Sequence, residues 1–119
     1  MKYMLLIHQG DAPTPYSPDD WARLSEAEQK EVYTAYQAIN ETPGVSPGVQ
    51  MQPPETATTV RVQDGKTLTT DGPFVAVKVA LGGWFLFDAD DLDAAIELAS
   101  RVPAARMGGA VEVRPIVEY

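Results

Sequence analysis

Three ionisable side chains, His8, Asp71 and Lys78, lie at the end of, or inside, segments whose composition is typical of β-strands. His8 is the single histidine of the chain and directly follows the apolar run from Met4 to Ile7. An imidazole titrates near neutral pH, so His8 could act as a general acid or base where a strand opens into a cleft. The alternative interpretation is an ordinary histidine at a strand end, bonded to backbone or water.

Lys78 interrupts the apolar run from Val75 to Leu81. A lysine embedded in such a run could hold an anionic substrate. It could equally lie at a sheet edge, with its methylene stem over apolar surface and its ammonium group in water. Both interpretations remain open from the sequence.

Asp71 precedes Gly72 and Pro73. Its carboxylate could face a pocket, but an aspartate in this position also forms a turn by bonding its own backbone. We therefore predict His8 and Lys78 as the catalytic candidates, with Asp71 supporting the turn or orienting them.

Metal and cofactor chemistry finds no support in the sequence. The chain has no cysteine and one histidine, which excludes thiolate sites and a typical zinc site. The acidic segment from Asp88 to Asp93 lacks the central glycine of a calcium loop, and Ala99 stands where the final glutamate should be. No phosphate loop, dinucleotide fingerprint or serine elbow is present, so we expect neither a metal nor a cofactor.

Size and charge limit the class of protein. The 119 residues, 12.9 kDa in mass, suit one domain over residues 1–119. A net charge of −8 would repel a phosphate backbone, so we do not expect nucleic acid as a partner. No apolar run reaches membrane-spanning length, and the first apolar run is too short for a signal-peptide core. We expect a cytoplasmic protein that does not enter membranes.

The helices and strands that must position these side chains are predicted from the spacing of apolar residues and from the glycines and prolines that end each element. Pro43 and Gly44 end a first helical region, and Asp64-Gly65 between two β-rich runs is typical of a hairpin. We expect Asp90 to cap the second helix and Pro103 to end it. The predicted elements are a strand at 2–8, a short helix after Ser17 and a longer one after Ser25, a strand at 49–52, a hairpin at 58–70, a strand at 82–87, a helix at 88–101 and a strand at 111–114.

The order β-α-β, hairpin, β-α-β matches a ferredoxin-like split βαβ sandwich with an inserted hairpin, an α+β fold. The first and third core strands are apolar on both faces. Two helices cover only one face of a four-stranded sheet, so we predict that a second copy of the same sheet covers the other face. The expected partner is therefore an identical chain, in a homodimer.

Several segments together resemble the YCII-related family, in its DGPF branch. They are Met1 to Ile7, Gln52 to Val62, Asp71-Gly72-Pro73-Phe74, Leu81 to Gly83, Asp90 to Ala95 and Pro103 to Pro115. The resemblance implies a dimeric α+β barrel and relatives that include small cofactor-free enzymes. It also implies members that accompany extracytoplasmic-function sigma factors.

Two departures from the family pattern bear on chemistry. Ala76 and Val79 stand where the pattern usually places glutamates, and Lys78 alone remains of that polar set. The first long helix carries Tyr33 and Tyr36 where relatives with a His-Asp pair have their histidine. The pair is therefore not predicted here.

Two functions remain open. The chain is predicted to bind a small molecule, as a cofactor-free lactonase, isomerase or dehalogenase-like enzyme. Alternatively, it is a non-catalytic regulatory or accessory protein, linked for example to such a sigma factor. A cavity with His8 or Lys78 pointing inward would favour the enzyme, and an apolar cavity would favour the accessory protein.

Overall fold

The computed structural model describes residues 1–15 and 18–119, without the side chains of Pro18 and Lys78. The predicted helix cap at Ser17 lies outside the described residues. The strands are β1 (Lys2–His8), β2 (Val45–Gln50), β3 (Thr58–Gln63), β4 (Lys66–Asp71), β5 (Leu81–Asp88) and β6 (Ala110–Pro115). The helices are α1 (Pro18–Ala22), α2 (Glu26–Asn40), α3 (Leu92–Ser100) and α4 (Pro103–Arg106), with 3₁₀ turns η1 (Pro54–Thr56) and η2 (Val77–Val79).

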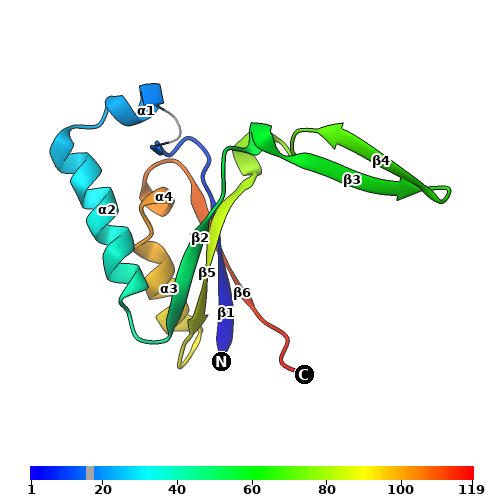
Figure 1. Cartoon of the computed structure of the whole chain (residues 1–119). Helices are drawn as coiled ribbons and strands as arrows, with labels where there is room; N and C mark the ends of the chain where they lie inside the picture. Colours follow the sequence, from blue (N-terminus) through cyan, green and yellow to red (C-terminus); the bar gives the residue numbers. More distant parts are fainter. Residues whose placement is uncertain (16–17) are drawn as a thin grey trace.

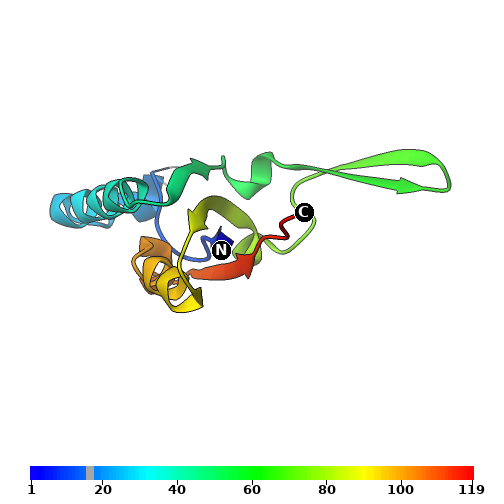
Figure 2. The same ribbon diagram turned by 90° about the horizontal axis from the view of Figure 1, so that it is seen from below.

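Four strands form one antiparallel sheet in the order β2-β5-β1-β6, and β3 and β4 form a separate pair. The two long helices, α2 and α3, cover the same face of the four-stranded sheet (Figures 1 and 2). This order and this placement confirm the predicted α+β, ferredoxin-like fold. The four-stranded sheet of the chain is open, with β2 and β6 at its edges.

Alternation along β1 sorts its side chains between the two faces. Tyr3, Leu5 and Ile7 are buried beneath the helices, whereas Met4 and Leu6 lie on the other face and are only half-buried. Trp84 and Leu86 of β5 pair with Leu6 and Met4 in the sheet and therefore share that face. We call the face that carries Met4, Leu6, Trp84 and Leu86 the open face.

Helix α2 begins at the second predicted cap. The Ser25 hydroxyl accepts from the Glu28 N–H at 3.1 Å, and the Glu28 carboxylate accepts from the Ser25 N–H at 2.9 Å. This capping box satisfies N–H groups that the first helical turn leaves unpaired. Val32 and Ile39 are buried on the predicted face, and Tyr36 packs partly buried against the core between them.

Helix α3 differs from its prediction in two ways. Asp91, and not Asp90, caps it, with its carboxylate accepting from the Ala94 N–H at 2.8 Å. Leu92 and Ile96 were expected in its buried stripe but are 48% and 50% exposed, while Leu98 is fully buried. Two stripes with helical spacing overlap in this helix because both include Ala95 and Ala99, so spacing alone could not choose between them.

Helix α3 ends at Ser100, before Pro103 as predicted, and Pro103 also begins a further short helix. Val102 is fully buried, the chain turns there, and Pro103 takes the first position of α4. Proline suits that position because its missing N–H would be unpaired anyway.

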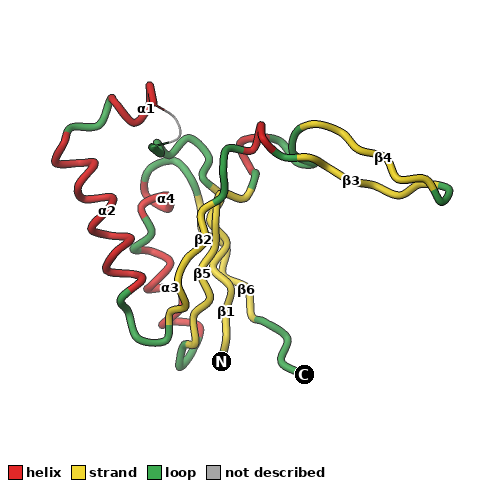
Figure 3. Tube along the Cα trace, in the orientation of Figure 1, coloured by secondary structure: helices red, strands yellow, loops and turns green. Residues whose placement is uncertain are grey.

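The hairpin of β3 and β4 is confirmed. Asp64 and Gly65 form its two-residue turn with φ of 51° and 75°, which suits the right-handed twist of paired strands. The pair projects far from the rest of the chain (Figures 1 and 3).

Strand β2 begins at Val45, four residues before its prediction, and has an irregularity between Ser46 and Val49. Within the described ranges, no helix has the length and apolar character needed to cross a membrane.

Candidate functional site

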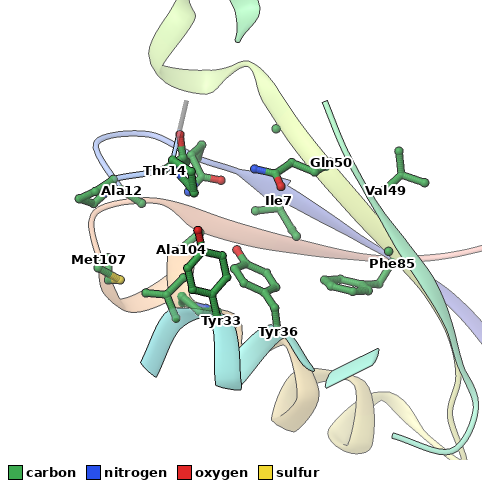
Figure 4. Close-up of a pocket in the computed structure, with 18 of the residues that line it drawn as sticks. Ile7, Ala12, Thr14, Tyr33, Tyr36, Val49, Gln50, Phe85, Ala104 and Met107 are labelled. Carbon is green, nitrogen blue, oxygen red and sulfur yellow. The ribbon is translucent and has the colours of Figure 1, made fainter. Parts of the chain in front are cut away.

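A cavity of about 230 Å³ lies between α2 and the covered face of the sheet (Figure 4). Its wall combines residues from strands β1, β2 and β5, from the loop after β1, and from helices α1, α2 and α4. The lining residues are Ile7, Gln9, Ala12, Pro13, Thr14, Pro15, Trp21, Val32, Tyr33, Tyr36, Asn40, Gly48, Val49, Gln50, Gly82, Gly83, Phe85, Pro103, Ala104 and Met107. Among these lining residues, none has a charged side chain.

Aromatic rings form much of the wall. The Tyr36 ring stacks on Phe85 with centroids 6.3 Å apart, and Tyr33 meets Trp21 edge to face at 5.5 Å. Burial raises the pKa of the Tyr36 hydroxyl above its ordinary value of 10.0, and the positive charge of Arg106 offsets part of this rise. The hydroxyl therefore stays protonated at neutral pH and can donate a hydrogen bond.

A few neutral polar groups reach the same space. The hydroxyls of Tyr33 and Tyr36 both point away from α2, toward the side of the cavity on which Gln50 lies (Figure 4). Asn40 has a structural task, because its Oδ1 accepts from the Gly48 N–H at 3.0 Å and so ties the end of α2 to β2. The cavity thus offers donors and acceptors that can orient a ligand without a charge.

Two glycines, Gly48 and Gly83, allow the close packing that shapes the wall of the cavity. A Cβ atom on Gly83 would stand 2.4 Å from the Val49 carbonyl oxygen, so any side chain there would push β2 away from β5. A Cβ atom on Gly48 would stand 2.4 Å from the Phe85 ring. The glycines therefore allow both the close approach of the strands and the position of the ring that the cavity needs.

A second cleft of about 400 Å³ adjoins the cavity and shares Gln9, Thr14 and Gln50 with it. This cleft is more polar, since Asp11, Asp20, Arg23 and Glu55 line it. The apolar cavity therefore opens toward a polar outer part.

His8 lies away from both spaces, on the edge of the open face. Its Nδ1 is 2.9 Å from the Val79 carbonyl oxygen, and its Nε2 is 3.3 Å from Glu112 Oε1. Both contacts are with acceptors, so both form at once only when each ring nitrogen carries a proton. The hydrogen bond from Arg114, and after it the one from His8, lowers the pKa of the Glu112 carboxyl below its ordinary value of 4.5.

Asp71 and Lys78 complete the predicted set. Asp71 ends β4 in an exposed position opposite Thr58. The side chain of Lys78 lies outside the described part of the chain, but its backbone belongs to η2, whose Val79 carbonyl contacts His8. The structure thus brings His8 close to η2 and leaves Asp71 on the hairpin, and neither His8 nor Asp71 lines the cavity or the cleft.

The sequence marks Tyr36 and Phe85, as aromatic residues, among the candidates to line an apolar pocket, and both line the cavity, but the other residues of the cavity were not found. Tyr36 had a visible signal, because it sits on the buried stripe of α2 yet carries a polar tip. A glycine inside an apolar strand, such as Gly83, is also a known sign of close backbone approach. In the described residues, no group of three or more histidine, aspartate or glutamate side chains is placed to hold a metal ion.

Comparison with known proteins sets this geometry in a family. The sequence matches the YCII-related domain over residues 1–119. The chain belongs to the YCII-related domain family. It is also 36% identical over 76 residues to a Rhizobium meliloti (strain 1021) protein described as "Uncharacterized protein R00369". That match covers 63% of this chain and 61% of the Rhizobium protein, so the similarity spans about three fifths of the relative. Membership in the YCII-related family agrees with the fold. The class of ligand must be inferred from the residues that line the cavity.

Proposed function

We propose that this YCII-related protein binds a small, uncharged molecule containing one ring in the cavity beneath α2. The observation that carries the proposal is the neutral, aromatic lining of a space of about 230 Å³. An apolar cavity of roughly 150 Å³ holds benzene, so this volume suits one substituted ring. A ligand with a net charge would lose its hydration without gaining an ion pair, which disfavours it.

Different wall residues would supply the apolar contacts and the hydrogen bonds to the ligand. Phe85 and Tyr36 supply apolar surface against the faces or edges of the ring. The Tyr36 hydroxyl donates to an oxygen of the ligand, and the Gln50 amide can donate or accept beside it. Tyrosines are the titratable groups among the lining residues, so the lining supports binding better than acid–base catalysis.

The test is a titration with p-cresol and with benzoate, two single-ring molecules of similar size of which only benzoate is charged at neutral pH, followed by NMR and by calorimetry. We expect p-cresol to shift the amide signals of Tyr36 and Gln50, and to bind at least about tenfold more tightly than benzoate. Tyr36→Ala should weaken p-cresol binding about tenfold, because it removes both ring contact and hydroxyl. Phe74→Ala, a loss of ring outside the cavity, is the matched control. Equal binding by the two ligands, or shifts confined to residues outside the cavity, would refute the proposal.

A second candidate function follows from the bonds of His8. Its two fixed ring nitrogens, beside Glu112 and next to η2, favour an acid–base role at the open face, in which Lys78 would hold the substrate and Asp71 would support the turn. In that case His8→Asn would weaken binding or turnover of a ligand while Tyr36→Ala would not. The same titration therefore separates the two candidates.

We also propose that the YCII-related chain forms a homodimer through its open face, which would close two sheets into a barrel. Met4, Leu6, Trp84 and Leu86 support this, because apolar surface gains roughly 25 cal/mol for each Å² removed from water. They form the β1 and β5 part of the open face, and Glu112 and Arg114 of β6 lie beside them. Light scattering at micromolar concentration should give twice the chain mass of 12.9 kDa. Leu6→Asp should return the protein to the mass of one chain with its circular dichroism unchanged. A wild-type protein with the mass of one chain would contradict the dimer.

A further inference from the structure

The chain exposes more surface than its size requires. Its accessible surface is 8048 Å², whereas a compact monomer of 12.9 kDa exposes roughly 6,300 Å². Its radius of gyration is 16.0 Å, against about 13.5 Å for a compact domain of this length. The hairpin of β3 and β4, residues 58–71, projects away from the rest of the chain and explains the difference (Figures 1 and 3). We call this hairpin the arm.

The two faces of the arm differ in chemistry. Residues directly opposite in an antiparallel pair share a face, so the register places Val60, Val62, Thr67 and Thr69 together, with Thr58 and Asp71 on the same face at the root of the hairpin. We call this the Val/Thr face. The opposite face carries Arg61, Gln63, Lys66 and Leu68.

The Val/Thr face is the one that needs a cover. Val60 and Val62 are 59% and 71% exposed. On the opposite face, the guanidinium of Arg61 lies over the Phe74 ring, 5.8 Å from its centroid. A two-stranded hairpin is at best marginally stable in water, so an arm of this length requires packing on one of its faces.

We propose that the Val/Thr face of each arm packs against a second copy of this chain, the copy that sits on the open face. This inference rests on the dimer proposed above. The arm leaves the chain on the side of the sheet opposite α2 and α3, which is the side of the open face (Figures 1 and 2). A second copy seated there therefore lies beside the arm.

Three half-exposed valines lie in the segment that joins the arm to β5. They are Val75, Val77 and Val79, of which Val77 also lines the polar cleft. Val79 reaches the edge of the open face directly, since its carbonyl oxygen accepts from His8. One partner can thus cover the open face, the backbone at Val79 and the arm together.

The area agrees with a second copy as the occupant. The excess of about 1,700 Å² falls within the roughly 1,000–2,500 Å² that each subunit buries in a permanent dimer. A two-fold axis also gives each arm the same environment on the other subunit, so both arms are covered in one closed assembly. An unrelated protein would have to match the open face and the arm at once.

The first test compares neighbouring substitutions on opposite faces of the arm. Val62→Lys and Gln63→Lys add the same charge at adjacent positions, and Val62 alone belongs to the Val/Thr face. By sedimentation equilibrium, Val62→Lys should raise the dimer dissociation constant at least about tenfold, and Gln63→Lys by no more than about twofold. Equal effects of the two substitutions would overturn the inference.

The second test asks what the arm touches. The chain contains no cysteine, so Val62→Cys can carry a single benzophenone label, with Gln63→Cys as its control. After mixing with an unlabelled, affinity-tagged copy, light should link Val62→Cys to the tagged copy much more efficiently than Gln63→Cys. A dimer without this link would overturn the arm contact and leave the dimer standing. A protein that stays monomeric would refute both.

Discussion

Leu5→Ala is expected to lower the free energy of unfolding by about 2–5 kcal/mol. Leu5 is fully buried in the central strand β1, between Phe85 of β5 and Val113 of β6. Truncation removes apolar packing and leaves a cavity that the two neighbouring strands prevent from collapsing. Urea unfolding followed by tryptophan fluorescence, at one fixed protein concentration, measures the loss of stability.

The matched control is Leu6→Ala, the same substitution one residue further along β1. Leu6 is half-buried on the open face. Its truncation should cost less than that of Leu5 and should depend on protein concentration, because in the proposed dimer the Leu6 side chain packs against the second subunit. An equal and concentration-independent loss of stability at both positions would contradict the assignment of the two faces.

Gly83→Ala is expected to lower the free energy of unfolding by about 1–3 kcal/mol and to abolish ligand binding in the cavity. The added Cβ atom would stand 2.4 Å from the Val49 carbonyl oxygen, which is backbone and cannot rotate aside. Strand β2 must therefore shift away from β5, and the wall that Val49 and Gln50 form shifts with it. Urea unfolding and titration with p-cresol measure the two effects.

Gly82→Ala is the neighbouring control. Its Cβ atom would stand 3.3 Å from both the Cβ and the Oε1 of Gln9, so the amide can rotate aside and the rest of the contact needs a shift of only a few tenths of an ångström. We expect a loss of stability below about 1 kcal/mol and measurable binding. A larger loss at Gly82 than at Gly83 would show that the approach of β2 to β5 does not limit the cavity.

Features with short-range causes were predictable from the sequence. The capping box of Ser25 and Glu28 and the turn at Asp64 and Gly65 depend on residues at most three positions apart, and both are confirmed. The start of α3 was wrong by one aspartate, because Asp90 and Asp91 are both suitable caps and the difference depends on how α3 packs. Predicting which face of α3 is buried failed for the same reason.

The set of residues that lines the cavity could not be predicted from such short-range patterns. Gln9, Tyr36, Gln50, Gly83 and Met107 come from separate segments, and only the folded sheet brings them together. Because β1 is apolar on both faces, its sequence does not reveal whether His8 shares a face with the helices. The structure decides this through alternation, which places His8 on the same face as Leu6.

The central position of β1 has a consequence for how the chain acquires its fold. Strand β1 is synthesised before both of its partners, β5 and β6, with which it pairs so that Lys2 meets Asp88 and His8 meets Ala110. Both pairings close long loops, which makes sheet formation slow compared with local helix formation in α2. Until β6 has been synthesised, β1 has two apolar faces and at least one unpaired edge. Nascent chains of this protein are therefore exposed to aggregation from the synthesis of β1 until that of β6.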